Sequence, residues 1–212
     1  MADIETVYII DDDASIRYAL DSLFRSAHLR TKAFESPREF LDGRPEKLEG
    51  CMVLDVRMPD GTGLEFQEKM AEVDIKLPIV FLTGHGNIQM SVRGMKAGAV
   101  DFLTKPFRDQ ELLDAVEQAM KRDRERRAFD DEHLKLNSRF TSLTRRELEV
   151  MRGVTAGKMN KQIAGNLGLS EITVKLYRRS AMQKMGAKSL AELVLMSARI
   201  KESGASALRA VA

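Results

Sequence analysis

The chain has 212 residues, 43% of them hydrophobic and 31% charged, which is normal for a soluble globular protein of one large or two ordinary domains. No apolar run approaches the roughly 18 residues that span a bilayer, no secretory signal is evident, and the single cysteine, Cys51, excludes an intrachain disulfide and fits a reducing cytoplasm. The net charge of +2 is uneven: residues 143–212 carry 13 Lys and Arg against 5 Asp and Glu, so an acidic N-terminal part precedes a basic part that suits a polyanion such as nucleic acid.

The first 120 residues alternate short apolar runs with amphipathic stretches. Each run has the length of a strand and is bounded by polar or turn residues. The stretches between them, such as SIRYALDSLFRSAH (15–28), carry apolar residues at helical spacing. Five strands alternating with five helices predict an α/β fold with a parallel sheet covered on both faces. The strands are expected at VYII (7–10), TKAF (31–34), CMVL (51–54), PIVFL (78–82) and AVDFL (99–103).

The segment KRDRERRAFDDEHLKLNSRF (121–140) is highly charged. It is either a solvated continuation of the fifth helix or a flexible linker. Because it contains neither Pro nor Gly, the sequence favours the helix.

Short helices alone are expected after residue 140. Thr144 and Glu147 have the spacing of a capping box that begins the first of them. A second helix should begin at Asn160, a third should run from Ser170 to Gly186, and SLAE (189–192) should begin a fourth. Residues 203–212 lack an apolar face and are expected to form a loose tail.

Polar residues follow four of the five predicted strands. Asp11 and Asp12 come after the first run, Asp55 after the third, Thr83 after the fourth and Lys105 after the fifth. Because the carboxyl ends of parallel strands converge on one crevice, these side chains should meet there. Clustered carboxylates suit Mg²⁺, and an aspartate beside such an ion can act as a nucleophile toward phosphorus. An acidic triplet alone could be a turn that caps the next helix, but the convergence of four strands favours a ligand site.

Four motifs, IIDDDAS, VLDVRMPDGTGLE, FLTGHG and DFLTKPF, together resemble the receiver domain of two-component response regulators over about residues 4–120. The resemblance implies a flavodoxin-like, five-stranded (βα)5 domain in which Asp55 accepts phosphate from a sensor histidine kinase. It implies that Asp11, Asp12 and Asp55 hold Mg²⁺ together with the backbone carbonyl of Arg57, and that PDGTG forms a tight loop beside the site. The phosphate-binding and switch residues implied by the resemblance are Thr83, Phe102 and Lys105.

Haloacid-dehalogenase-like phosphatases also combine a strand-end Asp with a Thr or Ser and a Lys. They need a second Asp two residues after the nucleophile, where this chain has Arg57, and their metal-binding acids follow the nucleophile in sequence. A fast hydrolase is therefore not expected. The chain should be no enzyme beyond catalysing its own phosphorylation and slow dephosphorylation.

The segment NKQIAGNLGLSEITVKLYRRSAMQKMG (160–186) has the pattern of a helix-turn-helix, in which the small Ala164 allows close helix packing and Gly168 permits the sharp turn. A basic helix that is merely solvated is the alternative, but the glycine turn, the capping boxes and the regional charge favour docking into the major groove of DNA. The residues of the third helix expected to face the core are Val174, Tyr177, Ala181 and Met185. Those expected on another face are Lys175, Leu176 and Arg179, with Arg178 near its edge.

The motifs LTRRELEVM, NKQIAGNLGLSEITVKLYRRSAMQKM and KSLAEL resemble the LuxR-type DNA-binding domain over about residues 138–201. With the receiver, the whole chain resembles the FixJ/NarL class of response regulators. By that resemblance the base-reading residues are Lys175, Leu176 and Arg179. The residues implied to contact DNA phosphates, which set affinity rather than sequence choice, are Lys161, Thr173 and Arg178.

The same resemblance implies two surfaces for dimerisation. In the DNA-binding part the fourth helix offers Ala191, Val194 and Leu195, although burial within one protomer would explain them equally well. In the receiver the surface would be formed by the fourth helix, the fifth strand and the fifth helix, with Val92, Lys96 and Phe102 on it or just beneath it. A two-fold symmetric dimer would read two half-sites.

The expected domains are a receiver at 1–120, a helical linker at 121–138, a helix-turn-helix domain at 139–202 and a flexible tail at 203–212. Phosphorylation of Asp55 would promote dimerisation and binding to double-stranded promoter DNA in the cytoplasm, and the bound regulator could also contact RNA polymerase. In an alternative, the receiver acts chiefly as an inhibitory docking module that phosphorylation releases. A docking protein that does not bind DNA is a third interpretation, which an absent or salt-insensitive DNA interaction would favour.

Overall fold

The computed structural model describes residues 5–59, 61–84 and 88–209. The chain divides into two compact units, an N-terminal unit (Met1–Arg127) and a C-terminal unit (Ala128–Ala212). In the described ranges no helix is both long and apolar enough to cross a membrane.

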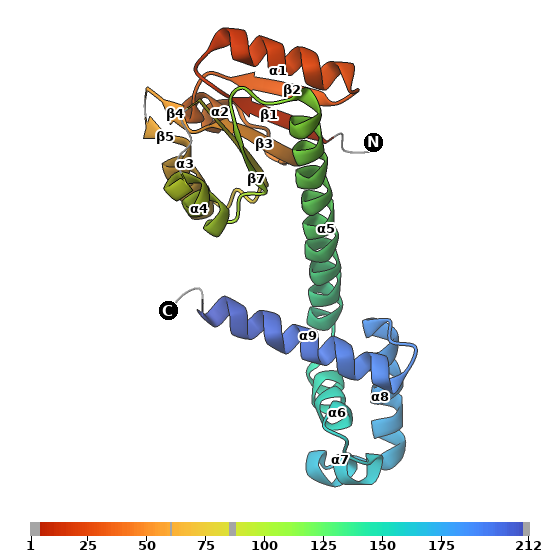
Figure 1. Cartoon of the computed structure of the whole chain (residues 1–212). Coiled ribbons are helices and arrows are strands. Elements are labelled where there is room, and N and C mark those ends of the chain that lie inside the picture. Colours follow the sequence, from red (N-terminus) through yellow and green to blue (C-terminus); the bar gives the residue numbers. More distant parts are fainter. Residues whose placement is uncertain (1–4, 60, 85–87, 210–212) are drawn as a thin grey trace. The chain divides into compact units, whose positions relative to one another are not determined.

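The N-terminal unit is built on a five-stranded parallel sheet (Figure 1). The strand order is β2-β1-β3-β6-β7, and β1 lies between β2 and β3 with Val7 opposite Thr31 on one side and Cys51 on the other. This arrangement confirms the predicted flavodoxin-like parallel sheet. The strands are β1 (Thr6–Ile10), β2 (Arg30–Phe34), β3 (Gly50–Asp55), β6 (Ile79–Thr83) and β7 (Asp101–Thr104).

Helices cover both faces of this sheet, and a separate apolar cluster fills each side. Alternate residues of a strand point to opposite faces, so Ile9 packs with α1 and α5 whereas Ile10 packs with α2 and α3. Burial on both faces explains why β1, β3 and β6 read as continuous apolar runs, whereas the edge strand β2 is mostly exposed. The helices are α1 (Ala14–Ser26), α2 (Pro37–Gly43), α3 (Gly63–Glu72), α4 (Ile88–Lys96) and α5 (Asp109–Thr141).

Two elements had no predicted range. The short helix α2 is capped by Ser36, begins with Pro37, and buries Phe40 against the rings of Tyr8 and Phe34 at centroid distances of 5.6 and 5.3 Å. After β3 the chain forms a small antiparallel hairpin of β4 (Arg57–Met58) and β5 (Gly61–Thr62). Both elements are too short for a periodic apolar pattern to identify them.

Helix α5 continues to Thr141, so the charged segment is helical and not a flexible linker. The expectation that this segment is solvated is wrong for Asp123, which is fully buried. Its carboxylate accepts hydrogen bonds from the backbone N–H of Gly50 at 3.0 Å and from Arg127 at 2.7 Å. Arg127 also pairs with Glu5 at 2.8 Å. A buried carboxylate needs such partners, and they fix this part of α5 to the amino ends of β1 and β3.

The C-terminal unit is all helical, with one apolar core that includes Val150, Ile163 and Val174. The capping box of Thr144 and Glu147 is present, Ser170 caps the third helix through the N–H of Thr173, and the turn glycine Gly168 adopts a left-handed conformation. These features confirm the predicted helices. They are α6 (Arg145–Thr155), α7 (Asn160–Leu167), α8 (Glu171–Met185) and α9 (Leu190–Arg209).

The prediction of a loose tail from residue 203 is wrong for residues 203–209, which belong to α9. The segment is rich in alanine, contains no proline, and is interrupted only by Gly204. One glycine costs a helix about 1 kcal/mol relative to alanine, which is too little to end a long helix by itself.

Candidate functional site

The carboxyl ends of three strands meet at one lysine. The Nζ atom of Lys105, which follows β7, lies 2.7 Å from Oδ2 of Asp11 and 2.7 Å from Oδ1 of Asp55. Asp11 is 2% exposed and Asp55 is 6% exposed, so water screens these contacts little. In sequence, Lys105 is 94 positions from Asp11 and 50 positions from Asp55, and the fold joins all three in one polar cluster.

Local packing fixes the position of Asp55 within this cluster. The second oxygen of its carboxylate, Oδ2, accepts a hydrogen bond from the backbone N–H of Arg57 at 2.7 Å. Gly63, the first residue of α3, lies so close that a Cβ atom there would be 2.3 Å from the carbonyl oxygen of Asp55. The backbone on both sides of the carboxylate is therefore held tightly.

The members of the acidic triplet after β1 are in different environments. Oδ1 of Asp11 accepts a hydrogen bond from the N–H of Asp13 at 2.9 Å, and Oδ1 of Asp13 caps α1 through the N–H of Ser15 at 2.8 Å. Asp12 is exposed. The turn and the ligand-site interpretations are thus compatible, because different members of the triplet serve each.

Burial and hydrogen bonding set the charges of the cluster. Burial raises the pKa of Asp11, against the lowering effect of Lys105 and the N–H of Asp13. Burial alone would lower the pKa of Lys105, but its hydrogen bonds to Asp11 and Asp55 raise that pKa overall. The lysine therefore stays charged at neutral pH.

The cluster suits a small hard cation. Within the described ranges no three carboxylate, histidine or cysteine side chains gather closely enough to form a complete metal cage, so Asp12 is not brought together with Asp11 and Asp55. Mg²⁺ is commonly held by one or two carboxylates, with water and phosphate oxygens completing its octahedron. Two carboxylates that already share one ammonium match that requirement.

The two predicted switch residues lie on neighbouring strands. Thr83 ends β6 and is buried, and its carbonyl oxygen accepts a hydrogen bond from the N–H of Lys105 at 2.7 Å. Phe102 on β7 is half-buried, with its ring 5.7 Å from that of Phe81. Parts of two quoted motifs, Asp60 of PDGTG and His85 and Gly86 of FLTGHG, lie outside the described residues.

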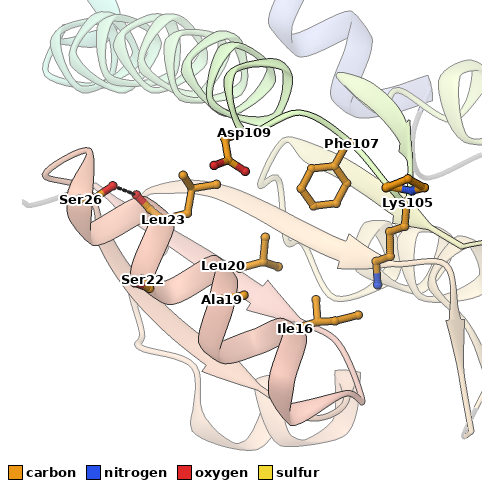
Figure 2. Close-up of a pocket in the computed structure, with 10 residues that line it drawn as sticks. Ile16, Ala19, Leu20, Ser22, Leu23, Ser26, Lys105, Phe107 and Asp109 are labelled. Atoms are coloured by element: carbon orange, nitrogen blue, oxygen red, sulfur yellow. Dashed lines mark hydrogen bonds between the residues drawn. The ribbon is translucent and has the colours of Figure 1, made fainter.

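An apolar hollow of about 630 Å³ lies beside Lys105. Figure 2 shows Ile16, Leu20 and Leu23 along one side of α1, facing Phe107 from the segment that precedes α5. A macromolecule that reached Asp55 would therefore find apolar surface next to the polar cluster.

Helix α8 in the C-terminal unit separates its core residues from its predicted DNA-reading residues. Val174, Ala181 and Met185 are buried, as predicted, and Tyr177 is half-buried. Leu176 is 63% exposed. The base-reading candidates Lys175, Leu176 and Arg179 are all exposed.

The residues predicted to contact DNA phosphates differ in their exposure. Lys161 is exposed in the first turn of α7, whereas Arg178 is half-buried and lines a hollow of about 500 Å³ with Lys175 and Arg179. Thr173 is half-buried, with its hydroxyl 2.8 Å from that of Ser170. The Thr173 hydroxyl can therefore take part in the helix cap and also contact a DNA phosphate.

A buried contact with no local sequence signal for its partners holds α8 against α6. Glu147, the acid of the capping box, also accepts hydrogen bonds from Lys184 at 2.7 Å and Ser180 at 2.5 Å. The capping box gave a sequence signal for Glu147, but nothing local indicated its two partners on α8.

The candidate dimer residues are exposed in the single chain. On α4, Val92 and Lys96 are exposed together with Ile88 and Met95, two further apolar residues whose helical spacing places them on the same face. On α9, Ala191, Val194 and Leu195 are exposed, and Leu193 between them is buried. Burial within one protomer therefore does not account for them.

Comparison with known families matches both units. The model of the response regulator receiver domain matches residues 7–117, and the model of bacterial regulatory proteins of the luxR family matches residues 141–197. Nodulation protein W of Bradyrhizobium diazoefficiens is 53% identical over 191 residues, which are 90% of this chain and 84% of that protein. Transcriptional regulatory protein FixJ of the same species is 40% identical over 193 residues, covering 91% of this chain and 94% of FixJ.

One solved structure is similar to this chain. The response regulator StyR superposes with a TM-score of 0.85 at 46% sequence identity, over 93% of this chain and 100% of the StyR chain.

Proposed function

Because the chain belongs to the two-component response regulators that join a receiver domain to a LuxR-type DNA-binding domain, we propose that it regulates transcription in response to phosphorylation of Asp55. A sensor histidine kinase would supply the phosphoryl group in the cytoplasm, and it would dock on the apolar hollow beside Lys105. The observation that carries the proposal is the bridge of Lys105 between Asp11 and Asp55.

In the proposed reaction, a carboxylate oxygen of Asp55 attacks the phosphorus of a phosphohistidine. The new O–P bond forms as the P–N bond breaks, and the departing imidazole keeps the electron pair and takes up a proton. The ammonium of Lys105 can neutralise a phosphoryl oxygen, and Thr83 can donate a hydrogen bond to another.

The carboxylates of Asp11, Asp12 and Asp55 and the carbonyl oxygen of Arg57 would hold Mg²⁺ for this reaction. When bound, the ion offsets negative charge on the phosphoryl oxygens. Asp11 and Asp55 already converge on Lys105, and Asp12 is exposed next to Asp11 in the same turn. Arg57 offers no acid at the position where phosphatases place one, so the acyl phosphate should hydrolyse slowly.

Phosphorylation would then be transmitted through the neighbouring strands. The added charge and acceptor oxygens draw Thr83 inward, and Phe102 rotates into the space that is left. The surface of α4 with Val92 and Lys96 changes, and two receivers pair. Pairing raises the effective concentration of two DNA-binding domains at one promoter, with α9 supplying their contact.

On DNA, α8 would lie in the major groove with Lys175, Leu176 and Arg179 at the base edges. Lys161, Thr173 and Arg178 would contact phosphates, which fix the register of the protein on the duplex. RNA polymerase is a further partner that the bound dimer could contact.

Incubation with a small phosphodonor and Mg²⁺ tests the phosphosite. Wild-type protein should gain one phosphoryl group by intact mass, and Asp55→Asn should gain none. A phosphoryl group on another residue would contradict the assignment.

Selection of bound DNA from a random pool, with and without phosphodonor, tests the regulatory part. Phosphorylation should enrich a site of two symmetric half-sites. Arg179→Ala should weaken binding to that site more than binding to random DNA, since base contacts carry the sequence preference. If the isolated 138–212 fragment bound tightly while the intact unphosphorylated chain did not, relief of inhibition would replace dimerisation as the main effect.

A further inference from the structure

Arg17, in the first turns of α1, contacts the main chain of the acidic turn. One nitrogen of its guanidinium, Nη1, donates hydrogen bonds to the backbone carbonyl oxygens of Asp11 at 2.7 Å and Asp12 at 2.9 Å. The side chain is half-buried. With three carboxylates so near, an arginine would ordinarily form an ion pair, but this contact is to the main chain.

The rest of the acidic turn is braced at other points. The N–H of Asp11 donates to the carbonyl oxygen of Phe34 on β2, the N–H of Asp13 donates to the Asp11 carboxylate, and the N–H of Arg17 donates to the carbonyl oxygen of Asp13. The Arg17 guanidinium adds the contact that joins the carbonyls of the first two acids to α1. Without it, neither of these carbonyl oxygens would have a link to the helix among the described contacts.

We propose that Arg17 is a positioning residue for cation binding. It fixes the main chain of Asp11 and Asp12, and so limits the positions from which their carboxylates can reach a cation beside Asp55. This inference rests on the proposed function, because it takes Mg²⁺ as the ligand of that site.

Two effects of Arg17 on the affinity for Mg²⁺ have opposite signs. Its positive charge repels a dication, so removal of the charge alone would tighten binding. Loss of a group that orients metal ligands typically weakens metal affinity 10- to 100-fold. Because one nitrogen of the guanidinium holds two carbonyl oxygens at 2.7 and 2.9 Å, we expect its orienting effect to exceed its repulsion of the cation.

The full-length protein is titrated with Mg²⁺, and the affinity is measured both by calorimetry and from the rise in melting temperature. Arg17→Met keeps the apolar stem without the donors and should raise the dissociation constant about tenfold or more. Arg17→Lys retains one cationic donor and should recover part of the affinity. The matched control is Arg25→Met on the same helix, where the exposed Arg25 pairs with Asp21 at 2.9 Å, and it should bind Mg²⁺ as the wild type does.

A second readout separates positioning from direct contact with the phosphoryl group. The rate of phosphorylation by a small phosphodonor is measured as a function of Mg²⁺ concentration. Arg17→Met should need more Mg²⁺ to reach half its maximal rate, and should approach the wild-type rate at saturation. A maximal rate that stayed low at saturating Mg²⁺ would overturn the positioning role.

The remaining outcomes are equally decisive. Equal or tighter Mg²⁺ binding by Arg17→Met would refute the inference and leave the proposed function intact. A wild-type protein that did not bind Mg²⁺ would instead contradict the proposed function. If Arg17→Met did not fold, Arg17→Lys would carry the same comparison against Arg25→Met.

Discussion

At the residue scale, Glu147 combines two structural roles in one carboxylate. It completes the capping box of α6 and accepts hydrogen bonds from Lys184 and Ser180 of α8, while its side chain is almost wholly buried. Burial alone would raise the pKa of Glu147, but hydrogen bonds from Lys184, Ser180 and Thr144 lower it to about 2. The folded C-terminal unit therefore favours the ionised form.

We expect Glu147→Gln to destabilise the C-terminal unit by about 1–3 kcal/mol at pH 7, because Lys184 loses its anionic partner. The pKa of Glu147 is lower in the folded than in the unfolded chain, so its contribution is present above about pH 4.5 and is lost as the pH falls toward 2. Urea unfolding at pH 7, 5 and 3 measures the difference between variant and wild type, which should shrink at pH 3.

Glu149→Gln is the control for this effect. Glu149 is on the same helix and pairs with the more exposed Arg145 and Arg146. Exposed ion pairs contribute little to the free energy of unfolding, so Glu149→Gln should be about as stable as the wild type. A difference for Glu147→Gln that was independent of pH would argue that the carboxylate charge does not stabilise the fold.

At the scale of elements, two glycines of the C-terminal unit occupy opposite environments. A Cβ atom on Gly153 of α6 would lie 2.8 Å from Cγ1 of Ile163 on α7, and Ile163 is buried. A Cβ atom on Gly165 of α7 would meet nothing within 4 Å. The first glycine allows α6 and α7 to pack closely, whereas the second serves no such contact.

The two alanine variants should therefore shift stability in opposite directions. Gly153→Ala should destabilise by about 1–3 kcal/mol, because it overpacks a buried contact. Gly165→Ala should stabilise by about 0.5–1 kcal/mol through helix propensity. Thermal and urea unfolding measure the stability of both variants relative to the wild type. If Gly153→Ala were stabilising, α6 and α7 would not pack as described.

At the scale of the whole molecule, the two units have separate apolar cores. Two clusters lie on the faces of the sheet, and the third lies among the helices of the C-terminal unit, to which the end of α5 contributes Leu136. Units with separate cores can unfold independently.

Scanning calorimetry of the intact chain should consequently show two transitions. Mg²⁺ should raise only the transition of the N-terminal unit, because ligand binding stabilises the unit that holds the site. Glu147→Gln should lower only the other, by about 4–8 °C for each kcal/mol lost. A single transition that both changes shifted equally would indicate one cooperative unit.

Local chemistry in the sequence was enough to determine much of this protein. The apolar runs predicted the strands, most clearly β1, β3 and β6, because burial on both faces leaves no polar alternation. Helix starts at Thr144 and Ser170 could be located, because a cap joins residues only three positions apart. The rule that parallel strands end at one edge was sufficient to predict that Asp11, Asp55 and Lys105 meet.

Only the tertiary structure decided which partners the buried and half-buried charged groups have. The carboxylate of Asp123 is buried and accepts hydrogen bonds from Gly50 and Arg127. Glu147 accepts a hydrogen bond from Lys184 of α8, and the Arg17 guanidinium donates to the main chain of the acidic turn. Charged residues of these types are usually solvated, so their sequence neighbourhood indicates a surface position. Their roles depend on partners that the folded backbone brings within 3 Å, and no local pattern records that distance.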